Sequence, residues 1–163
     1  MNKNKNIKKL ENEGYIILNN IIKKKDTLKI KIKLEKILNS RIKKKQVVGH
    51  KSNQIIYNFF VEDKSLLKLI DIPQVDKILT KILEPNYVLQ STNAQNRIMN
   101  KIDKKTKIKK PYKIGSTWHT DSRYLNNKRL HKGFSYLVII ALDAFTKFNG
   151  PTKFVEKSIN FLN

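Results

Sequence analysis

Apolar residues recur at helical spacing in the middle of the chain. Between positions 73 and 83 they fall three or four residues apart, which is typical of one buried face of an α-helix. Pro73 suits the first turn of this helix, because its missing N–H would be unpaired there in any case. Asp63 is suited to cap a shorter helix that runs to Ile70. This part of the chain is therefore predicted to be helical.

Two further helices are predicted nearer the start of the chain. A short helix over 5–13 ends against Gly14, a residue that often terminates helices. A longer helix is predicted over 27–39, because the segment is long and contains no internal turn residue. The same segment also alternates apolar and basic residues with the period of a strand, so a strand is the alternative. The alternating apolar residues are Leu28, Ile30, Ile32 and Leu34.

Other segments are rich in β-branched and aromatic residues and predict strands. The segment 134–142 is the strongest of them, and its central apolar run is expected to be buried on both faces. Residues 54–61 form a second candidate. Shorter strands are predicted at 15–18, from about Val88 onwards, and at 152–155. With helices first and strands later, the fold class is predicted to be α+β with a mainly β core.

The length of 163 residues is consistent with one domain over 1–163. The sequence has no run of about 18 apolar residues, so we expect no transmembrane helix and no membrane partner. The N-terminal residues lack the apolar segment of a secretory signal. The absence of cysteine excludes disulfides, thiolate metal sites and cysteine nucleophiles. A soluble, cytoplasmic protein is expected.

The chain is strongly basic, with a formal net charge of +22 at pH 7. Such a charge attracts polyanions and makes their binding depend steeply on salt. The joint abundance of Lys, Asn and Ile is also typical of an AT-rich coding sequence, so the charge alone does not decide function. A basic module that binds nucleic acid or another polyanion is one alternative. Against it, the aromatic residues are not interleaved with the basic runs in a stacking pattern.

The motif Trp118-His119-Thr120-Asp121 is the strongest candidate for chemistry. On a strand, residues i and i+2 point to the same side, so His119 and Asp121 would present an imidazole and a carboxylate to one metal ion. Two histidines and one carboxylate on Fe(II) leave positions open for substrate, cosubstrate and O₂. The alternative is an exposed polar pair without a ligand. The strand predicted at 134–142 and the Asn149-Gly150-Pro151 turn favour the metal site.

With these features the chain resembles the phytanoyl-CoA dioxygenase family of Fe(II)/2-oxoglutarate-dependent oxygenases. The resemblance rests on residues 118–124, 133–142 and 149–158. Residues 14–18 are also similar to the opening strand of the family. The sequence departs from the family at Ile159, where a histidine is usual.

The resemblance implies a hydroxylase that uses Fe(II), 2-oxoglutarate and O₂ on a small organic substrate. It implies a double-stranded β-helix, the cupin-like jelly roll, with N-terminal helices packed outside it. His119 and Asp121 would be the first two iron ligands. In the family the third ligand, a histidine, and the arginine that binds 2-oxoglutarate come later than position 163. We therefore expect a C-terminally truncated enzyme with an incomplete β-helix, and a non-catalytic relic of the fold is a further alternative.

The family also suggests residues that contact the cosubstrate. The strand before the motif often carries an amide side chain that touches 2-oxoglutarate, and Gln90 and Thr92 have same-face spacing there. On the strand after the motif, Ser135 and Tyr136 are similar candidates for hydrogen bonds to 2-oxoglutarate. A one-residue slip exchanges the faces of a strand. The opposite register before the motif would select Asn93 and Gln95 instead.

Two other residues, His131 and Arg123, are weaker candidates for the incomplete site. His131 lies in a basic loop, where a solvated histidine is the favoured interpretation over a metal ligand. Arg123 is the arginine nearest the motif, and a guanidinium group can bind a carboxylate through two hydrogen bonds. An exposed arginine without a ligand is the favoured interpretation there as well. Ile159 cannot ligate a metal.

Overall fold

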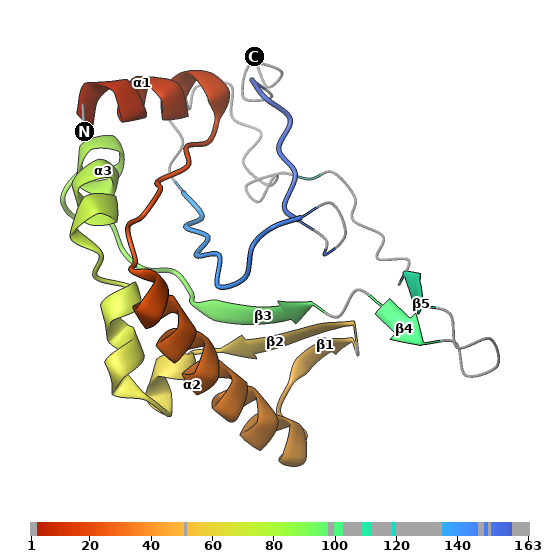
Figure 1. Cartoon of the computed structure of the whole chain (residues 1–163). Helices are drawn as coiled ribbons and strands as arrows, with labels where there is room; N and C mark the ends of the chain where they lie inside the picture. The colour runs from red at the N-terminus through yellow and green to blue at the C-terminus, as the bar shows by residue number, and fades with distance from the viewer. Residues whose placement is uncertain are drawn as a thin grey trace.

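Helices and a small antiparallel sheet make up most of the ordered secondary structure (Figure 1). The computed structural model describes residues 3–50, 52–97, 100–102, 109–111, 119, 135–146, 149 and 151–157. Its elements are, in chain order, α1 (Lys3–Glu13), α2 (Lys24–Lys43), β1 (Val48–His50), β2 (Asn53–Tyr57), the 3₁₀ helices η1 (Phe59–Val61) and η2 (Lys64–Leu69), α3 (Pro73–Leu83), β3 (Asn93–Arg97), β4 (Asn100–Ile102) and β5 (Lys109–Pro111).

The main sheet has three antiparallel strands in the order β1–β2–β3. Val48 pairs with Ile55 in the β1–β2 hairpin, and Tyr57 pairs with Asn93 between β2 and β3. Gly49 has a positive φ of 99°, and a β-carbon there would clash with the backbone oxygen of Asn53, so the hairpin requires glycine. Strands β4 and β5 form a separate pair. These sheets are smaller than a double-stranded β-helix, which therefore stays a prediction.

The hydrophobic core lies between α2 and the central strand β2. It gathers buried side chains from α2, β2, η1 and η2: Ile30, Leu34, Ile37, Leu38, Ile56, Phe59 and Leu66. Ala94 of β3 and Leu142 of the C-terminal segment pack against this cluster and are partly buried. The cluster therefore joins elements from both ends of the described chain.

Helix α2 confirms the helical prediction over 27–39 and extends it at both ends. Ile30 and Leu34, four residues apart, are buried, whereas Leu28 and Ile32 are 60 % and 44 % exposed. A strand would have placed all four on one face. Helical packing therefore divides the alternating residues between the core and the solvent.

Local sequence signals correctly located the ends of several helices. The N–H of Gly14 donates to the carbonyl of Leu10 at 2.9 Å, and Gly14 has a positive φ of 83° just beyond the end of α1. The carboxylate of Asp63 accepts a hydrogen bond from the N–H of Ser65 at 2.9 Å and caps η2. Pro73 occupies the first turn of α3, as predicted.

Three predicted strands were wrong in the described part of the chain. Residues 15–18, 135–142 and 152–155 adopt no strand, and Phe134 lies outside the described residues. The central apolar run is not buried on both faces, because Leu137 is 69 % exposed and Val138 is 45 % exposed. Strand propensity identifies a segment that suits a sheet, but a strand also needs a neighbouring backbone to bond with. No described strand pairs with these segments.

The two remaining predicted strands are present in the structure, but their boundaries differ from the predicted ones. The strand predicted at 54–61 ends at Tyr57, because Asn58 adopts a left-handed conformation with φ of 50° and begins the turn into η1. The strand predicted from about Val88 begins at Asn93. Among the described helices, none is long and apolar enough to cross a lipid bilayer.

The Asp63 cap predicts a specific pH dependence of stability. The Lys33 ammonium, 2.7 Å from the Asp63 carboxylate, and the Ser65 groups lower the pKa of Asp63 from 3.8 to about 2. A lowered pKa in the folded state stabilises the fold at pH values above the unfolded pKa, and this contribution is lost as the pH falls. The difference in free energy of unfolding between wild type and Asp63→Asn should therefore be constant above about pH 5 and shrink towards pH 2.

Urea denaturation at a series of pH values measures this difference. Lys33→Gln serves as the matched variant, because it removes the charged partner and leaves the Asp63 cap of η2 in place. It should remove much of the same pH dependence. A wild-type advantage over Asp63→Asn that stays constant down to pH 2 would contradict the assignment.

Candidate functional site

Of the two predicted metal ligands, the structure describes His119. His119 lies outside any helix or strand and is exposed, so a metal ion in solution can reach its surroundings. Asp121 lies outside the described residues. Within the described ranges, no three His, Cys, Asp or Glu side chains gather into a group that could hold a metal ion. A complete metal centre is therefore not assembled from these residues alone.

The predicted cosubstrate residues before the motif precede β3 instead of lying within it. Gln90 is exposed, and Thr92 is half-buried with its carbonyl accepting the N–H of Asn58 at 3.1 Å. The hydroxyl oxygen of Thr92 is buried and has no hydrogen-bond partner in the described part of the chain. A buried hydroxyl without a partner is energetically costly, so Thr92 would gain from a ligand or water nearby.

The residues of the alternative register, Asn93 and Gln95, lie within the strand β3. Both residues are exposed. The side-chain amide of Gln95 donates to the Asn93 side chain at 3.3 Å, as expected for residues i and i+2 on one face. Asn93 and Gln95 therefore lie on a strand that pairs with β2, whereas Gln90 and Thr92 precede that strand.

Ser135 and Tyr136 begin a segment that runs over 135–146 without helix or strand. Ser135 is exposed, whereas Tyr136 is half-buried. Burial raises the pKa of Tyr136 above its ordinary value of 10.0, and the nearby carboxylate of Glu11 raises it further. The phenol of Tyr136 therefore stays protonated over the physiological pH range and is available as a hydrogen-bond donor.

Residues 154–157, near the C-terminal end of the described chain, contact the end of α1 and the residues just after it. The rings of Tyr15 and Phe154 stack with centroids 4.9 Å apart and an interplanar angle of 7°. The Tyr15 hydroxyl donates to Glu156 at 3.1 Å, which raises the pKa of Tyr15. The N–H of Lys157 donates to the carbonyl of Glu13 at 3.3 Å. Residues far apart in the chain thus lie side by side at this point.

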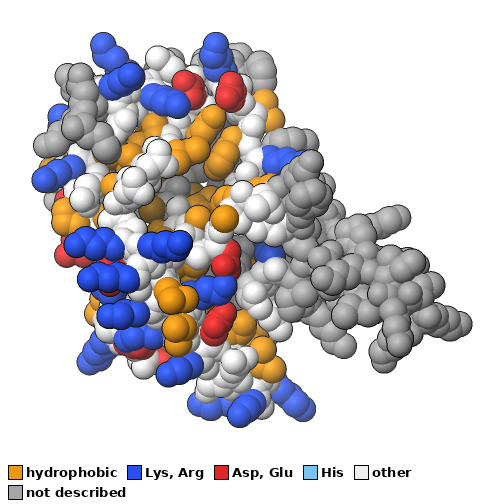
Figure 2. Space-filling model, in the orientation of Figure 1, with side chains coloured by type: hydrophobic (Ala, Val, Ile, Leu, Met, Phe, Trp, Pro, Cys, Tyr) orange, Lys and Arg blue, Asp and Glu red, His pale blue; other side chains and the backbone are white. Residues whose placement is uncertain are grey.

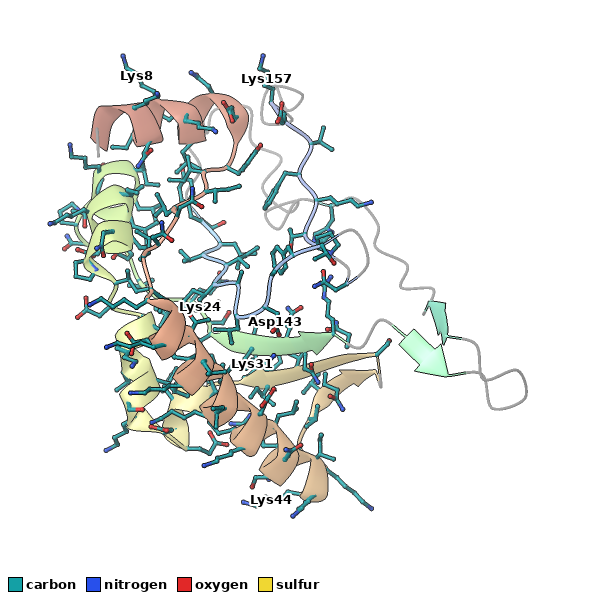
Figure 3. The ribbon with its side chains drawn as sticks, viewed as in Figure 1. Lys8, Lys24, Lys31, Lys44, Asp143 and Lys157 are labelled. Atoms are coloured by element: carbon teal, nitrogen blue, oxygen red, sulfur yellow. The ribbon has the colours of Figure 1, made fainter. Side chains whose placement is uncertain are left out.

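A second attachment joins the same segment to α2. The Lys31 ammonium donates to the Asp143 carboxylate at 2.6 Å, and this hydrogen bond raises the pKa of Lys31 (Figure 3). Beside it, Leu142 packs against the core cluster. The two attachments lie on either side of the Asn149 turn, whose side chain accepts the N–H of Thr146 at 2.8 Å and donates to the carbonyl of Ala144 at 2.6 Å.

These attachments were not found by sequence analysis. Lys31 and Asp143 are separated by 112 positions, and Tyr15 and Glu156 by 141. No local pattern distinguishes such a lysine or tyrosine from its exposed neighbours. Asn149 was singled out as part of a turn, but the two hydrogen bonds of its side chain were not predicted.

A cleft of about 460 Å³ lies between the start of α2, η2 and the start of α3. The buried residues Ile30 and Ile72 line it, together with charged side chains that include Lys23, Lys25 and Lys68. None of the five predicted site residues that the structure describes lines this cleft. These five residues are therefore separate from it.

Comparison with known proteins gives one match. The sequence model of the family described as phytanoyl-CoA dioxygenase (PhyH) matches residues 10–159. No curated protein and no solved structure matches the chain. The matched range includes the His-x-Asp motif and all four predicted cosubstrate residues.

Proposed function

The chain belongs to the phytanoyl-CoA dioxygenase family, and on this premise we propose that it hydroxylates a small organic molecule using Fe(II), 2-oxoglutarate and O₂. Members of this family are in general Fe(II)- and 2-oxoglutarate-dependent oxygenases that act on small molecules. The observation that carries the proposal is the family match over residues 10–159, which includes the His119–Asp121 motif.

His119 and Asp121 are the residues proposed to hold the iron. An imidazole nitrogen and a carboxylate oxygen form a donor set that suits Fe(II) and leaves positions open for other ligands. The exposure of His119 supports this role, because a ligand must be reachable by the metal. Bound iron would supply the activation of O₂ for oxidation of 2-oxoglutarate and substrate. The protein's own part is to hold the metal and orient the cosubstrate beside it.

Four polar residues are proposed to contact 2-oxoglutarate: Gln90, Thr92, Ser135 and Tyr136. Two of them have support from their surroundings. Thr92 has a buried hydroxyl oxygen without a partner in the described part of the chain. Tyr136 keeps a protonated phenol, which suits a hydrogen bond to a carboxylate.

Membership of the family also leads us to propose a fold for the chain. We expect one domain over 1–163 that follows the cupin-like jelly roll of the family. The described α2, β1, β2 and β3 would form part of it, with α2 packed against the sheet. The contacts that hold residues 135–157 against the region after α1 and against α2 support a single domain, because they join the two ends of the described chain.

Formation of succinate from 2-oxoglutarate tests the oxygenase proposal. We expect the purified 163-residue chain to form succinate only when Fe(II) and O₂ are both present. The rate should be low, because two metal ligands are identified in these residues where the family uses three. Manganese(II) in place of Fe(II) is the control and should give no succinate. If the chain binds metal at His119 but forms no Fe(II)-dependent succinate, the proposed metal site is supported and the oxygenase proposal is wrong.

A further inference from the structure

The outward face of α2 carries lysines without carboxylates between them. At about 100° per residue, the side chains opposite the buried face of this helix are Lys25, Leu28, Lys29, Ile32, Lys36, Asn39 and Lys43, and Glu35 borders this face beside Leu28. All seven side chains of the face are exposed. The four lysines extend over roughly 27 Å of the helix axis, at a rise of about 1.5 Å per residue. The face is long enough to contact an extended anionic surface.

None of the four lysines of this face forms an ion pair with a carboxylate in the described ranges. The ion pairs of α2 lysines lie on its flanks instead, where Lys31 contacts Asp143 and Glu35, and Lys33 contacts Asp63. The outward face therefore keeps its positive charge for an external partner.

The same face also exposes two aliphatic side chains. Leu28 is 60 % exposed and Ile32 is 44 % exposed, and both lie among the lysines. Figure 2 shows basic and hydrophobic side chains next to one another over α2. Nucleic-acid backbones offer phosphates but nothing apolar for these side chains to enter. A bilayer surface offers anionic headgroups and, just beneath them, an apolar layer.

We propose that the outward face of α2 binds the surface of membranes that contain anionic phospholipids. The lysines contact the headgroup phosphates and carboxylates, and Leu28 and Ile32 enter the boundary between headgroups and acyl chains. This surface binding departs from the sequence expectation of no membrane partner, which rested on the lack of a spanning segment. The helix lies on the membrane surface, and none of the described helices is long and apolar enough to cross it. The inference is independent of the oxygenase assignment, because it uses neither His119 nor Asp121.

Co-sedimentation with vesicles tests this surface. We expect the 163-residue chain to bind vesicles of equimolar phosphatidylserine and phosphatidylcholine, to bind less as salt is raised, and to bind little to phosphatidylcholine alone. Replacing the four lysines of the face by glutamine should weaken binding by roughly a thousandfold. A matched control makes the same charge change on η2 and α3, at the exposed Lys64, Lys68, Lys77 and Lys81. The control should lose much less affinity.

A second variant separates lipid insertion from charge. Leu28→Ser with Ile32→Ser keeps every lysine and should weaken vesicle binding several-fold while leaving binding to duplex DNA unchanged. Equal losses in the two four-lysine variants would overturn the proposal, because net charge and not this face would then drive binding. Full vesicle binding by the serine variant would also overturn it. Tighter binding to duplex DNA than to vesicles at the same salt would assign the face to nucleic acid instead.

Discussion

Replacing Leu66 by alanine is expected to reduce the free energy of unfolding by about 3–5 kcal/mol. Leu66 is fully buried in η2 and packs in the cluster that joins α2, β2 and η1. Truncating a buried leucine removes its transfer free energy and leaves a cavity that a well-packed core refills only in part. The loss is a large fraction of the stability of an ordinary domain, so the variant should unfold at a much lower urea concentration.

Leu67 provides the matched control for this prediction. It is the next residue in η2, has the same side chain and is 44 % exposed. Leu67→Ala should change the free energy of unfolding by less than about 1 kcal/mol, because close to half of the Leu67 surface stays in water and its truncation leaves no enclosed cavity in the core. Urea denaturation of both variants measures the contrast. Equal losses would mean that η2 does not pack against α2 and β2 as described.

The helices were predicted well because their signals are local. Gly14, Asp63 and Pro73 each mark a helix end through their own backbone or side-chain chemistry. The ambiguity of the segment around Ile30 was resolved by packing, since a helix can bury Ile30 and Leu34 while Leu28 faces solvent. Periodicity over a long segment was therefore sufficient for the fold of α2.

The strands were predicted less well because a ladder depends on distant segments. Residues 135–142 have strong strand propensity, yet the described part of the chain offers them no partner strand. They are held instead by the packing of Leu142 against the core cluster and by the contact of Asp143 with Lys31, which spans 112 positions. Pairing at such distances leaves no trace in a local apolar pattern.

The residues of the candidate site stay a prediction. The His119–Asp121 pair was proposed from its spacing, and the range matched by the family model includes both residues. The same-face choice between Gln90 with Thr92 and the next register depended on where β3 begins. That boundary is set by the pairing of β3 with β2, which the sequence around Gln90 does not encode.

Replacing His119 by alanine is expected to weaken binding of Mn(II), a surrogate for Fe(II), by on the order of a hundredfold. The loss of a nitrogen ligand leaves one carboxylate oxygen, which competes poorly with water for the metal. The chain has three histidines, so the remaining two give a complete set of controls. His50→Ala and His131→Ala should bind Mn(II) as the wild type does. Titration calorimetry of the four proteins measures the affinities, and a loss confined to His131→Ala would move the ligand to that residue.

The second ligand is tested by combining His119→Ala with Asp121→Asn. If both side chains hold one ion, each single variant loses most of the metal affinity. The double variant then loses little more, because one remaining ligand binds the ion only weakly. If the two residues acted independently, their losses in binding free energy would add. Calorimetry on the two single variants and the double variant measures this coupling. Additive losses would contradict a shared ion even when both single variants bind weakly, and would leave His119 without its predicted partner.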